Sequence, residues 1–325
     1  MRAVMCETFG PPETLVYKEV ADPEPGKGQV RIAIEAVGVN FPDTLIIEDK
    51  YQFKPQLPFA PGGEVAGTID AVGEGVSAER VGEKVMAMTL HGGFAEKIVV
   101  DEKALLKRPK DMPGHIAAAF TMTYGTSMHA LKQRGQLQPG ETLLVLGAGG
   151  GVGLAAVEIG KQMGATVIAA ASTAEKLAVA KAGGADHLIN YTEEDLRGRI
   201  KEITGGKGVD VFYDPVGGDL FEQALRSTGW GGRALVIGFA GGDIPKIPVN
   251  IPLLKGSAIV GVFWGAFRLR DVETDNANFD ELFAWYEAGK LKPHVTQTYP
   301  LEEAAIALNV LKNRQAIGKV VVTIK

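Results

Sequence analysis

The sequence is poor in the residues that build disulfides and metal sites. It contains a single cysteine, Cys6, in 325 residues, so a disulfide within the chain and a cysteine-rich zinc site are both excluded. The five histidines are scattered without H-x-x-x-H spacing: His91, His115, His129, His187 and His294. Because tetrahedral zinc needs three or four convergent nitrogen or sulfur ligands, we expect no metal.

The chain also lacks an excess of positive charge and a long apolar run. Lysine and arginine number 34 against 39 acidic residues, and no basic block occurs, which argues against a nucleic-acid partner. The first residues lack the apolar core of a signal peptide. The longest uncharged stretch, 112–131, is interrupted by Pro113, Gly114 and several polar residues, so it does not predict a membrane span. We expect a soluble, cytoplasmic protein with no membrane partner.

Glycine, in contrast, is abundant, with 42 residues, about twice the usual share. The glycines cluster in turns between short apolar runs, and the length suggests about two domains. Residues 1 to about 120 read as β-rich, which is typical of a small sandwich or barrel. The runs that carry this prediction are Gln29–Val37, Glu64–Val72, Lys84–Met88 and Ala95–Val100.

From about residue 143 to 260 the pattern changes to short apolar runs that alternate with helical segments. The runs are Thr142–Leu146, Thr166–Ala170, Val209–Tyr213 and Ala234–Phe239. This alternation predicts an α/β fold with a parallel sheet and helices on both faces. Two further helices, near 278–288 and 301–313, and a strand at 319–324 are expected to complete the chain.

The strongest chemical signal is the glycine-rich turn that follows the run Thr142–Leu146. It fits the dinucleotide pattern G-x-G-x-x-G, with Ala148 in place of the first glycine. A pyrophosphate needs close backbone approach and the free N–H groups at a helix start. The residues expected to bind it are Gly150, Gly151, Val152 and Gly153. The alternative is a turn whose glycines merely permit tight packing.

The end of the next strand indicates which nicotinamide cofactor is bound. NAD enzymes usually place Asp or Glu about 20 residues beyond the glycine turn, whereas Ser172 stands near that position here. A hydroxyl followed by Lys176 suits a 2′-phosphate, and Tyr191 offers another donor. We therefore favour NADP(H) over NAD(H), although Lys176 could also be a solvated residue of a first helical turn.

Six motifs in order give the chain a family resemblance over nearly its whole length. They are Gly38–Asp43, Pro61–Gly67, Asp214–Gly218, Gly238–Ala240, Gly261–Gly265 and Ile317–Val321, together with the glycine turn. The chain resembles the medium-chain dehydrogenase/reductase superfamily, and within it the zinc-free NADPH:quinone oxidoreductases. Zinc-dependent relatives place cysteine and histidine where Asn40 and Gly63 stand here, which reinforces the expectation that no metal is bound.

The resemblance implies two domains. A GroES-like, β-rich catalytic domain would comprise residues 1–120 and 265–325, and a Rossmann domain with a doubly wound parallel sheet would comprise 121–264. The cleft between them would hold the nicotinamide and the substrate. Members of the family are commonly homodimers, and the apolar run near Ala258–Val262 is expected at the contact.

Three residues are expected to be catalytic. By resemblance, Asn40 and Asp43 lie at the active cleft, where the Asn40 amide would donate to a substrate oxygen and Asp43 would orient the loop. Tyr51 would stack on a quinone or donate a proton. The alternatives are a loop hydrogen bond for Asn40, a helix cap for Asp43 and a half-buried aromatic for Tyr51.

Five further residues are expected near the nicotinamide by the same resemblance, with core packing as the alternative for each. They are Thr123, Gly238, Phe239, Val262 and Phe263. The predicted activity is zinc-independent hydride transfer from NADPH to quinones or related α,β-unsaturated carbonyls. Two alternatives stay open, an enoyl-thioester reductase that acts on a CoA substrate and an NADPH-binding protein with a structural or regulatory role.

Overall fold

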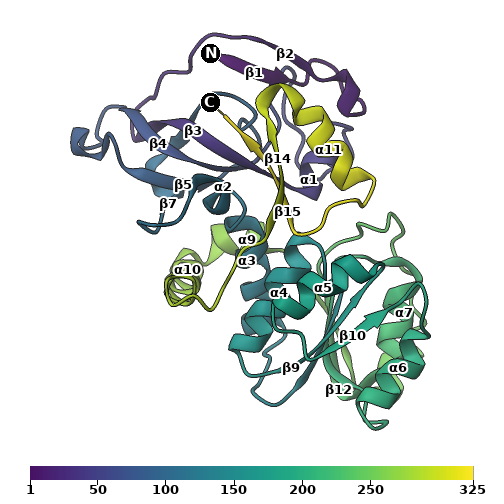
Figure 1. Cartoon of the computed structure of the whole chain (residues 1–325). Helices are drawn as coiled ribbons and strands as arrows, with labels where there is room; N and C mark the ends of the chain where they lie inside the picture. The colour runs from purple at the N-terminus through teal and green to yellow at the C-terminus, as the bar shows by residue number, and fades with distance from the viewer. Residues whose placement is uncertain (325) are drawn as a thin grey trace. The chain divides into compact units, whose positions relative to one another are not determined.

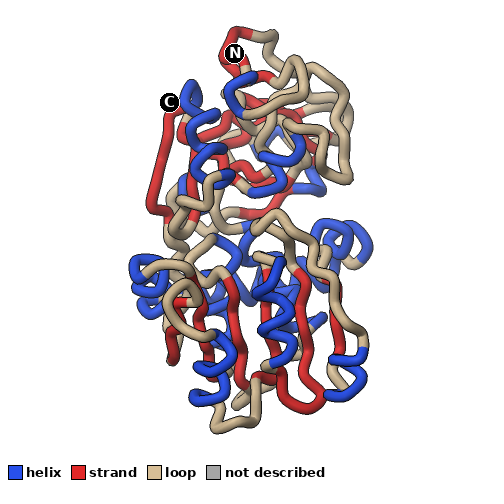
Figure 2. Tube along the Cα trace, turned by 90° about the vertical axis from the view of Figure 1, so that its right-hand side faces the viewer, coloured by secondary structure: helices blue, strands red, loops and turns tan. Residues whose placement is uncertain are grey.

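The computed structural model describes residues 1–324, which form two compact units (Figures 1 and 2). The first unit comprises Met1–Met122 and the segment that begins at Pro293. The second unit comprises Thr123–Lys292. None of the helices within residues 1–324 combines the length and apolar character that a membrane span requires.

The first unit is built on a seven-stranded sheet in the order β14-β15-β3-β4-β5-β7, with β6 also paired to β3. Its strands are β3 (Gln29–Val39), β4 (Glu64–Val72), β5 (Lys84–Met88), β6 (Lys97–Asp101), β7 (Leu105–Lys107), β14 (Val295–Pro300) and β15 (Lys319–Thr323). Strands β14 and β15 are parallel, and the other pairs are antiparallel. Burial alternates along the first half of β3, so one face of this strand packs on the core.

Short elements close this unit around its core. A separate two-stranded sheet joins β1 (Arg2–Met5) to β2 (Val16–Glu19). The α-helices are α1 (Phe41–Ile46), α2 (Gly114–Ala117) and α11 (Ala304–Lys312), and the short 3-10 turns are Pro12–Thr14, Ala78–Arg80, Glu102–Ala104 and Leu301–Glu303. The core includes Ile32, Val65, Phe94 and Val322, each fully or almost fully buried. The expected β-rich domain is confirmed.

The second unit contains a six-stranded parallel sheet in the order β10-β9-β8-β11-β12-β13. Its strands are β8 (Thr142–Leu146), β9 (Thr166–Ala171), β10 (His187–Asn190), β11 (Val209–Asp214), β12 (Thr228–Val236) and β13 (Ala258–Gly261). Numbered along the unit this order is 3-2-1-4-5-6, the doubly wound order of a Rossmann fold. The predicted α/β class with a parallel nucleotide-type sheet is therefore confirmed.

Helices connect consecutive strands of this sheet. They are α4 (Gly151–Gln162), α5 (Ala174–Ala182), α6 (Leu196–Ile203), α7 (Gly218–Arg226) and α8 (Asn250–Lys255). Figure 1 shows α4 and α5 on one face of the sheet and α6 and α7 on the other. The remaining helical segments are α3 (Thr121–Met128), the π-helical turn His129–Arg134, α9 (Trp264–Arg270) and α10 (Val272–Glu287).

The compact units divide the C-terminal part differently from the expected domain boundaries. The sequence placed 265–292 with the catalytic domain, whereas the structure groups these residues with the second unit. The reason is packing on α3: a side chain at Gly125 would collide with the Trp264 ring, 2.7 Å away. The indole of Trp264 donates to Asp275 at 2.7 Å, which ties α9 to α10.

Candidate active site

The glycine-rich turn lies where β8 ends and α4 begins. Gly147 adopts a φ of +59°, a conformation that L side chains rarely adopt. A Cβ on Gly153 would lie 2.3 Å from the Gly147 carbonyl oxygen, so only glycine lets the helix pack this closely on the loop. These are the geometric roles that the expected pattern assigns to its glycines.

The first turn of α4 provides a cradle for an anion. Gly150 is the N-cap residue with an extended backbone, and a Cβ there would meet only the Gly147 oxygen, at 3.5 Å. The first N–H groups of an α-helix have no acceptor within the helix, and its N-terminus carries partial positive charge. Gly151, Val152 and Gly153 therefore place donors at an approachable backbone surface. The residues fit a pyrophosphate group.

The three residues expected at the 2′-phosphate gather beside this turn. A Cβ on Gly149 would lie 2.4 Å from the Lys176 Cβ, so Lys176 packs directly against the loop. Ser172 follows the last residue of β9, and the Tyr191 N–H donates to the Ala171 carbonyl at 3.2 Å. The structure thus brings Ser172, Lys176 and Tyr191 to one end of the sheet, where β9 ends without an acidic residue.

The remaining expected nicotinamide residues of this unit lie at the same end of the sheet, where the strands have their carboxyl ends. The Gly238 N–H donates to the Asp214 carbonyl at the end of β11, at 3.4 Å, and Phe239 follows it. The Val262 N–H donates to the Val236 carbonyl at 3.0 Å, and Phe263 is the N-cap of α9. Because the carboxyl ends of parallel strands share one edge, this is where α/β folds bind ligands.

The carboxylate of Asp214 shapes the loop between β11 and α7. It accepts the N–H of Val216 at 2.7 Å and of Gly217 at 3.0 Å. Burial raises the pKa of Asp214 to about 6, and these two backbone donors oppose the rise. Asp214 was noted in the sequence as part of a motif, but its role in the loop was not predicted.

Thr123 is buried on α3. A residue on the same face of this helix, Ser127, contacts the first turn of α4. Ser127, four residues later and hence on the same face, donates its hydroxyl to the Val152 carbonyl at 3.0 Å. The same hydroxyl lies 2.9 Å from the Tyr213 hydroxyl. Helix α3 therefore supports the first turn of α4, and Thr123 is on the supporting face.

In the first unit, β3 ends in a buried cluster of charged and polar side chains. The Lys319 ammonium donates to Asn40 Oδ1 at 2.7 Å, to Glu64 Oε2 at 3.0 Å and to the Val39 carbonyl at 3.1 Å. Glu64 Oε1 accepts the Met122 N–H at 2.8 Å. Glu64 is 0% exposed and Lys319 6%, so this ion pair is shielded from water.

Asp43 joins this cluster through the backbone. Its Oδ2 accepts the Asn40 N–H at 2.8 Å, which is the helix-capping contact at the start of α1. The side chain is buried, and burial raises the pKa of Asp43 to about 7. The Asn40 N–H and the charge of Lys319 oppose that rise, whereas Glu64 adds to it.

Comparisons with known proteins agree with this architecture. The family model "Zinc-binding dehydrogenase" matches residues 151–284, and "Alcohol dehydrogenase GroES-like domain" matches residues 26–110. A quinone oxidoreductase-like protein 2 homolog from Nematostella vectensis is 38% identical over 326 residues, covering 100% of this chain and 89% of that protein. The chain belongs to the quinone oxidoreductase family of the medium-chain dehydrogenase/reductase superfamily.

Solved structures of the quinone oxidoreductase family superpose on the whole chain. The quinone oxidoreductase of Pseudomonas syringae pv. Tomato DC3000 gives a TM-score of 0.92 at 33% identity, covering 99% of both chains. The Escherichia coli quinone oxidoreductase, complexed with NADPH, gives a TM-score of 0.91 at 30% identity, covering 99% of this chain and 100% of that chain. The expected family resemblance is confirmed.

Asn40 and Gly63 stand at the two positions that hold zinc ligands in other branches of the superfamily. Both positions are constrained by contacts within this chain. A Cβ on Gly63 would lie 2.5 Å from the Thr89 carbonyl oxygen, so a histidine there would need a backbone shift. The Asn40 side chain is held by protein groups. Within residues 1–324, no group of three or more His, Cys, Asp or Glu side chains is placed to hold a metal ion.

The hydrogen bonds of Asn40 differ from its expected role. Its Nδ2 donates to the Gly38 carbonyl at 3.1 Å and to Glu64 Oε2 at 2.9 Å. Both amide protons thus have protein acceptors, whereas the sequence predicted donation to a substrate oxygen. The physical reason is Glu64, a fully buried carboxylate that requires donors. The geometry assigns Asn40 to positioning the end of β3 and the start of α1.

Tyr51 follows α1 and lies half-buried against the core of the first unit. Its ring centroid is 6.1 Å from that of Phe53. Burial, and then the nearby Asp43 carboxylate, raise the pKa of Tyr51. No residue in 1–324 makes a hydrogen bond with the Tyr51 hydroxyl. A phenol that keeps its proton and has no protein acceptor is suited to donate to a ligand.

Sequence reasoning assigned no function to Glu64 and Lys319. The available signal was their position: each is the first residue of a strand whose following residues are apolar and buried. A charge at such a point needs a partner. The identity of the partner depends on which strands pair, and that was not readable from the sequence.

Proposed function

We propose that the protein is a zinc-independent reductase that transfers hydride from NADPH to quinones or related α,β-unsaturated carbonyls. The observation that carries the proposal is the glycine cradle at the carboxyl end of β8, flanked by a strand end without an acid and by Lys176. Membership of the quinone oxidoreductase family supports it. The Escherichia coli relative is complexed with NADPH.

The cofactor, when bound, supplies the hydride, and the chain supplies binding and orientation. The first turn of α4, with Gly150 as N-cap, would hold the pyrophosphate. Ser172, Lys176 and Tyr191 would hold the 2′-phosphate, for which Lys176 offers a cation and the strand end offers no repelling carboxylate. The loops at the ends of β12 and β13 would orient the nicotinamide.

Tyr51 would supply the proton. The Tyr51 hydroxyl is protonated at neutral pH, as in any tyrosine of ordinary pKa, and burial raises its pKa further. The buried cluster of Asn40, Asp43, Glu64 and Lys319 fixes the loop that precedes Tyr51 and so acts by positioning. A hydroquinone anion can take its proton from water, whereas an enolate must be protonated on carbon. The free Tyr51 hydroxyl therefore favours enones or enoyl thioesters as a second substrate class.

A panel of acceptors tests the proposal. Loss of reduced-nicotinamide absorbance is followed with NADPH or NADH and with quinones, simple enones or an enoyl-CoA as acceptor. Turnover of quinones or enones with NADPH supports the proposal. Turnover of the enoyl-CoA alone would assign the chain to the enoyl-thioester reductases. Binding of NADPH without turnover of any acceptor would instead indicate a structural or regulatory protein.

Tyr51→Phe separates the two proposed substrate classes because it removes only the hydroxyl. With quinones, kcat should stay within a few-fold of the parent, while with enones it should fall about 10²-fold or more. Phe53→Leu, which changes the neighbouring residue and keeps the Tyr51 hydroxyl, serves as the control and should leave both rates near the parent. If Tyr51→Phe leaves kcat unchanged on every acceptor, Tyr51 is not the proton donor.

We also propose that the chain forms a homodimer through the edge of the parallel sheet. Strand β13 lies last in the sheet order, and Ile259 on it is 43% exposed. Val249 and Leu253, on and just before α8, are 79% and 78% exposed. An open strand edge beside large exposed apolar side chains favours pairing with a second copy.

A further inference from the structure

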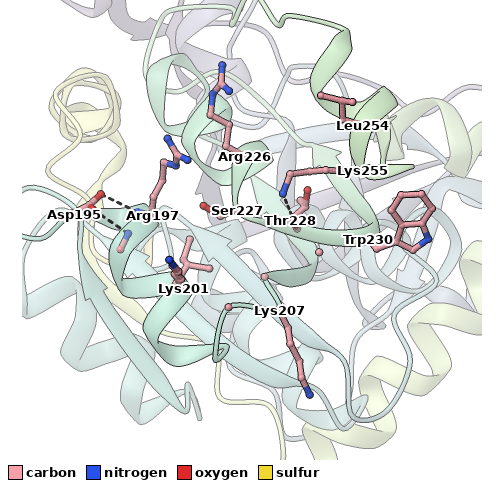
Figure 3. A pocket seen from close by; sticks show the side chains of 15 residues that line it. Asp195, Arg197, Lys201, Lys207, Arg226, Ser227, Thr228, Trp230, Leu254 and Lys255 are labelled. Carbon is pink, nitrogen blue, oxygen red and sulfur yellow. Dashed lines mark hydrogen bonds between the residues drawn. The ribbon is translucent and has the colours of Figure 1, made fainter.

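A cavity lies in the Thr123–Lys292 unit, at the end of the parallel sheet opposite the glycine turn. It has a volume of about 560 Å³ and is lined by α6, by the residues that precede β11 and β12, and by the end of α8 (Figure 3). These are the amino-terminal ends of strands that run parallel to β8. The cavity is therefore separate from the cradle at the carboxyl ends.

The lining is rich in cations. Arg197, Lys201, Lys207 and Lys255 contribute to it, and within residues 1–324 none of them has a carboxylate within ion-pair distance. The fifth lining cation, Arg226, pairs with Glu222 at 2.6 Å. One lining carboxylate is present, that of Asp195, and it accepts the backbone N–H groups of Arg197 and Gly198.

Lys255 shows that these charges lie close enough to act on one another. Its Nζ donates to the Thr228 carbonyl at 2.6 Å, so its one protein partner is neutral. Burial, and then the charge of Arg197, lower the pKa of Lys255. Like charges held together without compensation attract an anion, and arginine and lysine are the usual donors to phosphate.

The cavity also has an apolar wall. Trp230 and Leu254 line it and are 84% and 74% exposed. In the view of Figure 3, Arg197 lies on one side, Trp230 on the other and the Lys255 ammonium between them, while Lys207 extends away. An exposed indole offers a flat surface on which a base can stack. The volume lies in the range of small-molecule sites and well exceeds the needs of one phosphate.

We propose that this cavity binds a nucleotide that carries two or more phosphates. The phosphates contact Arg197, Lys201 and Lys255, and the base rests on Trp230. The site goes beyond the proposed reductase function, because it lies at the other end of the sheet from the residues that hold the cofactor. A ligand there would act on the enzyme from a distance rather than take part in hydride transfer.

The test is calorimetric titration of the full-length protein with ATP in the presence of saturating NADPH, which fills the cofactor site. We expect one ATP per chain. Arg197→Gln combined with Lys255→Gln should weaken ATP binding at least about tenfold, since two charge-assisted contacts are lost. Lys181→Gln is the control for a change of net charge: it removes one positive charge from an exposed position on α5, outside the cavity, and should leave the affinity within about twofold.

Further ligands test the chemistry of the site. Adenosine should bind weakly because it lacks phosphates, and Trp230→Ala should weaken ATP more than inorganic pyrophosphate. Absence of ATP binding to the NADPH-saturated protein would overturn the proposal, as would an equal loss in Lys181→Gln. Pyrophosphate that binds as tightly as ATP would overturn the assignment to a nucleotide. Reductase activity measured without ATP is independent of these outcomes.

Discussion

Asp43 is the residue for which burial has the clearest consequence for stability. Its pKa is raised from 3.8 to about 7 in the folded chain. Between these pH values the folded state binds more protons than the unfolded state, so the free energy of unfolding falls as pH rises through this window. The effect is of the order of a few kcal/mol.

Asp43→Asn should remove this dependence, because asparagine cannot ionise yet still offers an oxygen to the Asn40 N–H. The melting temperature of the parent should fall more steeply between about pH 4 and pH 7 than that of the variant. Asp111→Asn, at an exposed position, should keep the slope of the parent. Parallel curves for the parent and Asp43→Asn, followed by circular dichroism, would contradict the prediction.

Lys176 decides the preference between the two nicotinamide cofactors in our proposal. Lys176→Ala removes a charged hydrogen bond to the 2′-phosphate, which is typically worth about 1.5–3 kcal/mol. The NADPH dissociation constant should therefore rise roughly tenfold or more, while that for NADH should barely change. Lys181→Ala, on the exposed side of the same helix, is the control. An equal loss with both cofactors would mean that Lys176 supports the loop instead.

At the scale of elements, the contact between α4 and the glycine turn depends on the absence of a side chain at Gly153. In Gly153→Ala the added Cβ would meet the Gly147 oxygen at 2.3 Å and the Ala148 Cα at 2.9 Å. The helix must move away from the loop, which disturbs the cradle. We expect NADPH affinity, measured by fluorescence titration, to fall at least about tenfold.

Gly183→Ala controls for the higher helix propensity of alanine. Gly183 closes α5, and an added Cβ would meet its neighbours at 3.4 Å or more, which is ordinary contact. This variant should bind NADPH as the parent does. If Gly153→Ala also binds normally, the close packing of the helix on the loop does not matter for the cofactor.

The buried ion pair joins three elements of the first unit. In Lys319→Met, β15 loses its contacts with Asn40 and the Val39 carbonyl, and the Glu64 carboxylate is left buried without its cation. Breaking a buried pair in this way costs about 3–5 kcal/mol. The double variant Lys319→Met/Glu64→Gln should recover part of this loss in urea unfolding. A single variant within about 1 kcal/mol of the parent would contradict the prediction.

This ion pair also shows why the sequence predicted one half of the site better than the other. The glycine turn is local: strand, loop and helix follow one another within 142–162, and spacing alone indicates them. Lys319 and Glu64 meet only because Val320 pairs with Val39 and Glu64 pairs with Gly38. Such registers join residues far apart in the sequence. No local sequence pattern therefore indicates that the Asn40 amide already donates to protein acceptors.

The grouping of 265–292 with the second unit depends on a distant contact in the same way. The sequence indicated helices there but not the surface on which they pack. That surface is formed around Gly125, a glycine inside α3 whose missing side chain makes room for the Trp264 ring. The parallel arrangement of the second sheet, by contrast, was predictable from the sequence. Strands that alternate with helices can adopt only a few topologies.

At the scale of the whole molecule, the homodimer proposal predicts a mass of about twice 34.4 kDa in light scattering at micromolar protein. The decisive variant is Leu253→Glu on α8. Leu253 is 78% exposed in the single chain, so a charge there costs the isolated fold little, but it would have to be buried against a second copy at the β13 edge. The variant should therefore shift the mass to that of one chain while its circular dichroism stays unchanged.

Leu269→Glu is the matched control, because Leu269 on α9 is 79% exposed and lies outside the proposed surface. A parent that scatters as a monomer, or a Leu269→Glu variant that dissociates to the same degree, would show that the edge of β13 is not the contact.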